Sequence, residues 1–202
     1  MSTPAAYFEA MYEQGVDPWH LGTRWYERRK HALTVACLSR ERYNSAFEPG
    51  CSLGALTALL APRCRSLLAT DRVPAAVTAA SDRLAGQAGV RVTQLAVPYQ
   101  WPDQRFDLVV LSEIGYYLDP ADLAVLITAA VGSLEPGGEL VAVHWRHEVG
   151  EHAMDGDAVH DQIRAHPELQ RITDHREDDF ALEVFVRVPP APVSVAAREG
   201  LC

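Results

Sequence analysis

The 202-residue sequence predicts an α/β fold with one doubly wound, mostly parallel β-sheet. Two observations lead to this prediction. Short apolar segments alternate along the chain with longer segments of helical composition, which is the pattern of consecutive β-α-β units. The last two apolar segments follow one another without a helix between them, so an antiparallel hairpin is expected at one edge of the sheet. The length suits a single domain with one core.

Apolar and β-branched segments mark the expected strands. Residues 106–112 (FDLVVLS) are the most apolar, so this strand is expected at the centre of the sheet with both faces buried. Residues 89–97 are rich in β-branched side chains, which favour strands. Strands are expected at residues 45–51, 65–71, 89–97, 106–112, 138–145, 169–176 and 180–188.

Proline and glycine bound most of the expected helices. Pro74 suits the first turn of one helix, and Asp119-Pro120 opens another that ends at the breaker Pro136-Gly137-Gly138. Residues 98–105 are few, so this crossover is either a turn or a short helix. The other helices are expected at residues 25–39, 53–61 and 155–165.

These elements predict a single Rossmann-like domain over residues 1–188. Residues 1–44 precede the first strand and form an N-terminal helical extension. The Pro/Ala-rich tail, residues 189–202, is expected to be flexible and unnecessary.

Composition excludes several classes of partner. The formal net charge of −9 disfavours nucleic acid, because an acidic surface repels phosphates. No apolar run approaches the ~20 residues that span a bilayer, and the N-terminus lacks the features of a signal peptide. The four cysteines form no CxxC pair, so we expect reduced thiols in a cytoplasmic protein.

The strongest motif is Glu48-Pro49-Gly50-Cys51-Ser52-Leu53-Gly54, which follows the first expected strand and opens the first helix after it. Ligands of open α/β sheets collect outside the carboxyl ends of the strands, and glycines in such a turn let a ligand approach the backbone. A carboxylate at Glu48 would repel a phosphate and attract an ammonium group. The ligand is therefore expected to be cationic or zwitterionic at this end.

Asp71 ends the second expected strand, where an acid accepts hydrogen bonds from ribose hydroxyls. The alternative is a helix N-cap, because Pro74 follows closely. Together with Glu48, Asp71 indicates a nucleoside that carries an amino-acid-like tail.

With these motifs the sequence resembles the class I S-adenosylmethionine-dependent methyltransferases. Residues 48–54 resemble their first motif, with Ser52 in place of the middle glycine, and Asp71 matches their ribose acid. Residues 106–110 resemble the fourth-strand motif, and residues 134–140 the turn before strand five. The resemblance covers residues 44–146 and implies S-adenosyl-L-methionine as cofactor.

A closer resemblance is to the NodS-like branch of small N-methyltransferases. It rests on Asp17-Pro18-Trp19, on residues 25–30 (WYERRK) and on residues 112–118 (SEIGYYL). In that branch the N-terminal segment folds over the cofactor, so the resemblance places Trp19, Arg24 and Tyr26 near it; the alternative for Trp19 and Tyr26 is helix packing. The cofactor-binding residues implied are Trp19, Arg24, Tyr26, Glu48, Gly50, Cys51, Gly54, Asp71, Arg72, Ala96, Val97 and Ser112.

Two residues are expected to act on the acceptor. An amine nucleophile must lose a proton, so a nearby acid or histidine can assist methyl transfer. Glu113 is the first candidate and His144 the second, with a packed structural histidine as the alternative for His144. Three roles are expected for Tyr116 and Tyr117: they line the pocket, attract a cationic amine or pack in the core.

Other functions stay open as alternatives. Residues 50–54 also spell the G-x-S-x-G nucleophile elbow of serine hydrolases, although only one strand precedes them. A dinucleotide-dependent oxidoreductase is a weaker alternative, because the sequence lacks the G-x-G-x-x-G spacing of that class. A further alternative is a catalytically silent partner protein that binds the cofactor. His147, His152, Asp155 and His160 lack the spacing of a metal site, so no metal is expected.

The resulting hypothesis is methyl transfer to a small-molecule amine, such as an amino sugar or a secondary-metabolite precursor. It involves neither nucleic acid nor membrane insertion, and a homodimer is left open.

Overall fold

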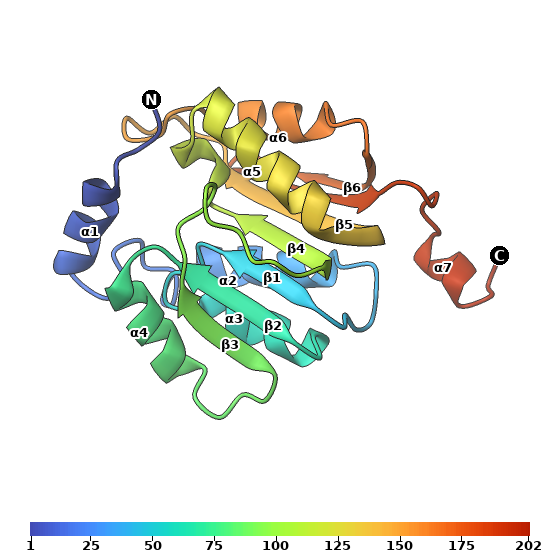
Figure 1. The fold of residues 1–202 in the computed structure, drawn as a ribbon, viewed down its shortest axis with the longest axis horizontal. Coiled ribbons are helices and arrows are strands. Elements are labelled where there is room, and N and C mark those ends of the chain that lie inside the picture. Colours follow the sequence, from blue (N-terminus) through green and yellow to red (C-terminus); the bar gives the residue numbers. More distant parts are fainter.

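The computed structural model describes all of residues 1–202 and contains one seven-stranded sheet. The strand order is β3-β2-β1-β4-β5-β7-β6, and β7 alone runs in the direction opposite to the other six strands (Figure 1). The predicted α/β class, the mostly parallel sheet and the antiparallel pair at the C-terminal edge are therefore confirmed. The chain order reverses between β1 and β4, which makes their carboxyl ends the switch point of the sheet.

The strands follow the apolar segments of the sequence closely. Every residue of β4 except the last is buried, as expected for a central strand between two helical layers. The edge strand β3 is half-exposed. The strands are β1 (Ala46–Pro49), β2 (Leu67–Asp71), β3 (Val90–Gln94), β4 (Phe106–Ser112), β5 (Leu134–Trp145), β6 (Leu169–Arg176) and β7 (Phe180–Arg187).

Helices cover both faces of the sheet. One apolar cluster joins α5 (Pro120–Ser133) and α6 (Gly156–Arg164) to one face, and a second joins α2 (Trp25–Ala36) and α3 (Ala55–Leu60) to the other. Helix α4 (Pro74–Arg83) packs over β2 and β3. No helix is long and apolar enough to cross a membrane.

The structure differs from the expected elements at the N-terminus and at the end of α5. A helix α1 (Ala5–Glu13), which the sequence reading missed, lies across the carboxyl end of the sheet (Figure 1). Helix α5 ends at Ser133, before the Pro136-Gly137-Gly138 breaker, because that segment forms an irregular part of β5 paired with β4. The crossover at residues 98–105 contains a turn and no helix, which is one of the two alternatives that the sequence left open.

The C-terminal segment leaves the sheet after β7 and forms a short helix α7 (Val195–Arg198) (Figure 1). It contacts the domain through Arg198, which donates to the carbonyl and the hydroxyl of Ser39. Whether residues 189–202 are unnecessary stays a prediction.

Candidate functional site

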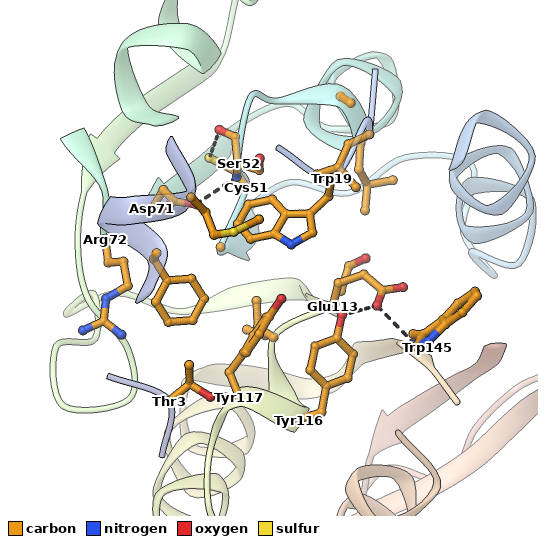
Figure 2. Close-up of a pocket in the computed structure, with 18 of the residues that line it drawn as sticks. Thr3, Trp19, Cys51, Ser52, Asp71, Arg72, Glu113, Tyr116, Tyr117 and Trp145 are labelled. Carbon is orange, nitrogen blue, oxygen red and sulfur yellow. Dashed lines mark hydrogen bonds between the residues drawn. The ribbon is translucent and has the colours of Figure 1, made fainter. Parts of the chain in front are cut away.

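A cavity of about 700 Å³ opens at the carboxyl ends of β1, β2, β4 and β5. Its wall consists of the strand ends and of segments from the first 31 residues. Helices α1 and α2 therefore cover the cavity at the carboxyl end of the sheet. In Figure 2, Asp71 and Arg72 lie at one end, Glu113, Tyr116 and Trp145 lie at the other, and Trp19 lies between them. This arrangement divides the cavity into two chemically different ends.

The loop after β1 forms the first end. Gly50 has a φ of +71°, and a Cβ at this position would lie 2.4 Å from Cγ2 of Ile114. Glycine is therefore required here both by the backbone conformation and by the close approach of the loop after β4. Gly54, with a φ of +75°, starts α3 but does not line the cavity.

Glu48 lies at the bottom of this loop and is 3% exposed. Its Oε2 is buried and has no hydrogen-bond partner. Burial raises the pKa of Glu48 to about 7; the nearby Thr57 hydroxyl opposes the shift, and the nearby Asp71 adds to it. A buried carboxylate oxygen without a partner in a cavity wall suits a ligand that brings a positive charge.

Asp71 holds the loop together from the end of β2. Its Oδ2 accepts from the backbone N–H of Ser52 at 2.9 Å, and its Oδ1 from that of Val73 at 3.0 Å. The N-cap of α4 is Val73, so Asp71 does not cap that helix. Each carboxylate oxygen retains accepting capacity for a ligand hydroxyl.

Aromatic residues of the N-terminal segment cover this end. Trp19 packs edge-on against Tyr12 of α1, with ring centroids 5.6 Å apart, and the Tyr12 hydroxyl lies 2.6 Å from Ser52 Oγ. The guanidinium of Arg72 lies 5.2 Å from the centroid of the Phe8 ring. Helix α1 is thus attached directly to the loop that follows β1.

The second end contains a buried cluster of charges. Lys30 is 2% exposed, and its Nζ lies 2.6 Å from Glu113 Oε1 and 3.0 Å from Glu27 Oε2. Burial would lower the pKa of Lys30, but the two carboxylates outweigh it and raise the pKa above its usual range. Lys30 is therefore a cation within the cavity wall, and its Nζ also lies 4.9 Å from the centre of the Tyr26 ring.

Glu113 is held rigidly within this cluster. It has a φ of +58°, which is rare for a residue with a side chain. Its Oε2 accepts from the Tyr116 hydroxyl and from the backbone N–H of Trp145, the latter at 3.1 Å. Burial raises the pKa of Glu113, yet Lys30 and these donors together bring it below its ordinary value.

His144 does not belong to the site. The sequence suggested it as a second candidate base, but the side chain is 0% exposed and does not line the cavity. Its Nε2 accepts from the backbone N–H of Gly115 at 3.1 Å, and burial lowers its pKa well below the ordinary value. The geometry therefore supports the alternative that His144 is a packed structural histidine.

Two alternative functions lose support from the geometry. A nucleophile elbow needs a histidine within reach of the serine, whereas Ser52 Oγ is buried and bonded to the Tyr12 hydroxyl. The histidines considered for a metal lie apart. His160 contacts His144 inside the core, His147 pairs with Asp179, and His152 stacks on Tyr116.

Most residues expected at a cofactor line this one cavity. Ala96 does not, and its N–H is bonded to the side chain of Gln100, whereas the neighbouring Leu95 does. The expected residues that line the cavity are Trp19, Arg24, Tyr26, Glu48, Gly50, Cys51, Asp71, Arg72, Val97, Ser112 and Glu113.

The polar side chains of α2 that face the interior of the protein were not predicted from the sequence. Four polar side chains on this helix are buried: Glu27, Lys30, His31 and Thr34. Their spacing of three and four residues places them on one side of a helix, which is the pattern that could have shown them. Tyr12 and the other aromatic residues of α1 were also missed.

The family model of Nodulation protein S (NodS) matches residues 12–176. The chain is 30% identical over 148 residues to Nodulation protein S of Bradyrhizobium diazoefficiens, which covers 71% of each chain. It is 35% identical over 127 residues to that of Rhizobium tropici, covering 62% of this chain and 53% of the relative.

Two solved structures are similar over most of this chain. A putative methyltransferase from Pseudomonas syringae is 46% identical, with a TM-score of 0.73, and the match covers 81% of this chain and 100% of that one. N-methyltransferase NodS from Bradyrhizobium japonicum WM9, in complex with S-adenosyl-L-homocysteine, is 25% identical, with a TM-score of 0.77 and coverage of 89% and 97%. By contrast, the chain spans 53% and 59% of the Rhizobium tropici and Sinorhizobium fredii relatives.

Proposed function

Because this chain belongs to the NodS family, we propose that it transfers a methyl group from S-adenosyl-L-methionine to an amine nitrogen of a small molecule. The observation that carries the proposal is that one cavity joins two ends of different chemistry. One end offers the acid-and-glycine loop with Asp71, and the other offers a carboxylate-rich cluster.

The first end suits S-adenosylmethionine. The partnerless Oε2 of Glu48 can accept from the ammonium of the methionine part, and Asp71 can accept from ribose hydroxyls. Gly50 leaves the backbone accessible beside them. When bound, this cofactor supplies an electrophilic methyl group on a positively charged sulfur.

The second end suits an amine. Two carboxylates, Glu27 and Glu113, face one ammonium, Lys30, so this part of the wall has a net negative charge. Tyr26 and Trp145 add aromatic rings with centroids 5.5 Å apart, which attract cations and pack against apolar faces. An amino sugar combines a cationic amine with such apolar ring faces, and we take it as the first acceptor class to test, in a cytoplasmic setting.

The experiment begins with calorimetric titration of S-adenosylmethionine and S-adenosylhomocysteine, with NAD as the control ligand. We expect both adenosyl compounds to bind and NAD to give no heat. Methyl transfer is then measured with glucosamine and short glucosamine oligomers, each matched by its N-acetylated form. Mass spectrometry should find methyl on nitrogen in the free amines only. No binding of S-adenosylmethionine, or methyl on oxygen or carbon, would contradict the proposal.

A further inference from the structure

We propose that Glu27 accepts the proton from the acceptor amine, while Glu113 stays ionised in a fixed ion pair with Lys30. The inference rests on the proposed amine methylation and assigns a role within it. The sequence predicted Glu113 as the base and did not point to Glu27.

Glu113 is poorly placed to take a proton, because both of its oxygens are engaged. Oε1 lies 2.6 Å from the Lys30 ammonium, and Oε2 accepts from both the Tyr116 hydroxyl and the Trp145 backbone. Protonation of Glu113 would break a buried ion pair and leave the charge of Lys30 less well compensated, which is costly inside a protein. Glu113 therefore orients Lys30 and stays ionised.

Glu27 lies on the same cavity wall and is less engaged. Its side chain is 10% exposed, and its one charged contact through Oε2 is the ion pair with Lys30 at 3.0 Å, whereas Glu113 is bonded to three donors. Burial raises the pKa of Glu27 despite the opposing effect of Lys30. A carboxylate that is largely removed from water and bonded to a single donor group gains more from binding a proton than one bonded to three, so Glu27 is the better proton acceptor of the two.

The charged and titratable groups around Glu27 support this assignment. Lys30 and Arg24 lower its pKa, and Glu113 raises it. The Nε2 of His31 lies 3.8 Å from Glu27 Oε2, and burial together with Lys30 lowers the pKa of His31 to about 4. His31 is thus neutral near pH 7 and does not neutralise Glu27.

The acceptor enters as an ammonium; one N–H bond breaks, its electron pair stays on nitrogen, and an O–H bond forms on Glu27. The neutral nitrogen then forms a bond to the methyl carbon as the carbon–sulfur bond breaks, with that electron pair remaining on sulfur. Glu27 returns its proton to solvent through the cavity mouth.

The test compares Glu27→Gln with Glu41→Gln, which makes the same change at an exposed site. With glucosamine as acceptor at pH 7, we expect kcat of Glu27→Gln to fall about 100-fold, the scale for loss of a general base. Affinity for S-adenosylhomocysteine should be unchanged in both variants. As the pH rises, kcat/KM of Glu27→Gln should increase about tenfold per pH unit and approach wild type, because solution then supplies the neutral amine.

The pH profile separates the possible outcomes. A loss that is the same at every pH would mean a structural role and would overturn the assignment of Glu27, as would unchanged activity. If Glu27→Gln fails to fold, Glu27→Asp keeps the carboxylate and should retain the flatter wild-type profile at reduced kcat; a steep profile in Glu27→Asp overturns the assignment. A wild-type protein that binds S-adenosylmethionine but methylates no amine overturns the proposed function first, and the role of Glu27 with it.

Discussion

His144 Nδ1 lies 3.2 Å from His160 Nε2, and this contact belongs to a hydrogen-bonded chain through the core. Because the backbone N–H of Gly115 donates to His144 Nε2, the His144 proton is on Nδ1 and points at His160. His160 Nδ1 in turn lies 2.6 Å from Glu183 Oε2. The chain thus connects α6 and β7 to the loop after β4 that carries Glu113 and so positions one wall of the cavity.

Replacing Glu183 by Gln should destabilise the protein by about 3 kcal/mol, because it removes a buried carboxylate that pairs with Arg164 and Arg171 and accepts from His160. Glu183 is 0% exposed, and although burial raises its pKa, His160, Arg171 and Arg164 bring it down to about 2. A depressed carboxyl pKa stabilises the fold above the unfolded value of 4.5, and this contribution disappears as the pH falls toward 2.

Urea unfolding between pH 7 and pH 2 tests this prediction. The difference in stability between wild type and Glu183→Gln should shrink below about pH 4.5. Glu177→Gln is the control, since Glu177 pairs with Arg29 at a partly exposed position and should contribute less than about 1 kcal/mol. If the two variants lose the same unfolding free energy, the buried hydrogen bonds of Glu183 contribute no more to stability than the exposed ion pair of Glu177.

His144→Gln should reduce stability without removing catalysis. Glutamine can still accept from the Gly115 N–H, but it cannot continue the chain to His160 with the same geometry. We expect a loss of about 1–3 kcal/mol in unfolding free energy and a change in kcat of less than tenfold. A general base would contribute roughly 100-fold or more, so a loss of that size with the fold intact would return His144 to the catalytic site.

Gly50→Ala should disturb both the fold and the cofactor site. A positive φ costs roughly 1–2 kcal/mol with a side chain present, and the added Cβ would lie 2.4 Å from Ile114. Gly86→Ala is a matched control, because its φ is +82° but nothing lies within 4 Å of the added Cβ. Thermal unfolding should show loss in both variants, whereas only Gly50→Ala should weaken S-adenosylhomocysteine binding, by tenfold or more. Equal affinity of both variants for S-adenosylhomocysteine would contradict the assignment of Gly50 to the cofactor site.

Glu48 should make cofactor binding depend on pH. With a pKa of about 7, Glu48 is increasingly protonated below pH 7 and then cannot pair with an ammonium group. The affinity for S-adenosylhomocysteine should therefore decrease below pH 7 by up to tenfold per unit and level off above it. Glu48→Gln should bind weakly at every pH, and a variant that keeps the wild-type pH dependence would mean that another group is responsible.

Asp71→Ala should weaken S-adenosylhomocysteine binding by about 1–3 kcal/mol, the scale for a lost hydrogen bond to a charged group. Part of the loss will come from the loop, because Asp71 also holds the backbone N–H of Ser52. Titration with adenosine-free S-methylmethionine distinguishes the two effects, since this probe has no ribose. If Asp71 contacts the ribose, its removal should weaken the adenosyl ligand more than the probe.

Local patterns were sufficient for the sheet and for one end of the site. The apolar segments predicted strands such as β4 because burial on both faces selects apolar residues, and the loop from Glu48 to Gly54 is contiguous in the chain. Helix α1 was missed because its aromatic residues gain stability only from packing against distant partners such as Tyr117.

By itself, the sequence determined the α/β class, the family and the identity of the loop after β1, since each of these depends on residues that are close together in the chain. Tertiary structure decided which polar side chains face the cavity. Lys30 and Glu113 are 83 positions apart, and His144 is separated from the cavity by contacts with Gly115 and His160. Local composition specifies how the backbone folds, but the direction of a polar side chain follows from the partners that the fold brings to it.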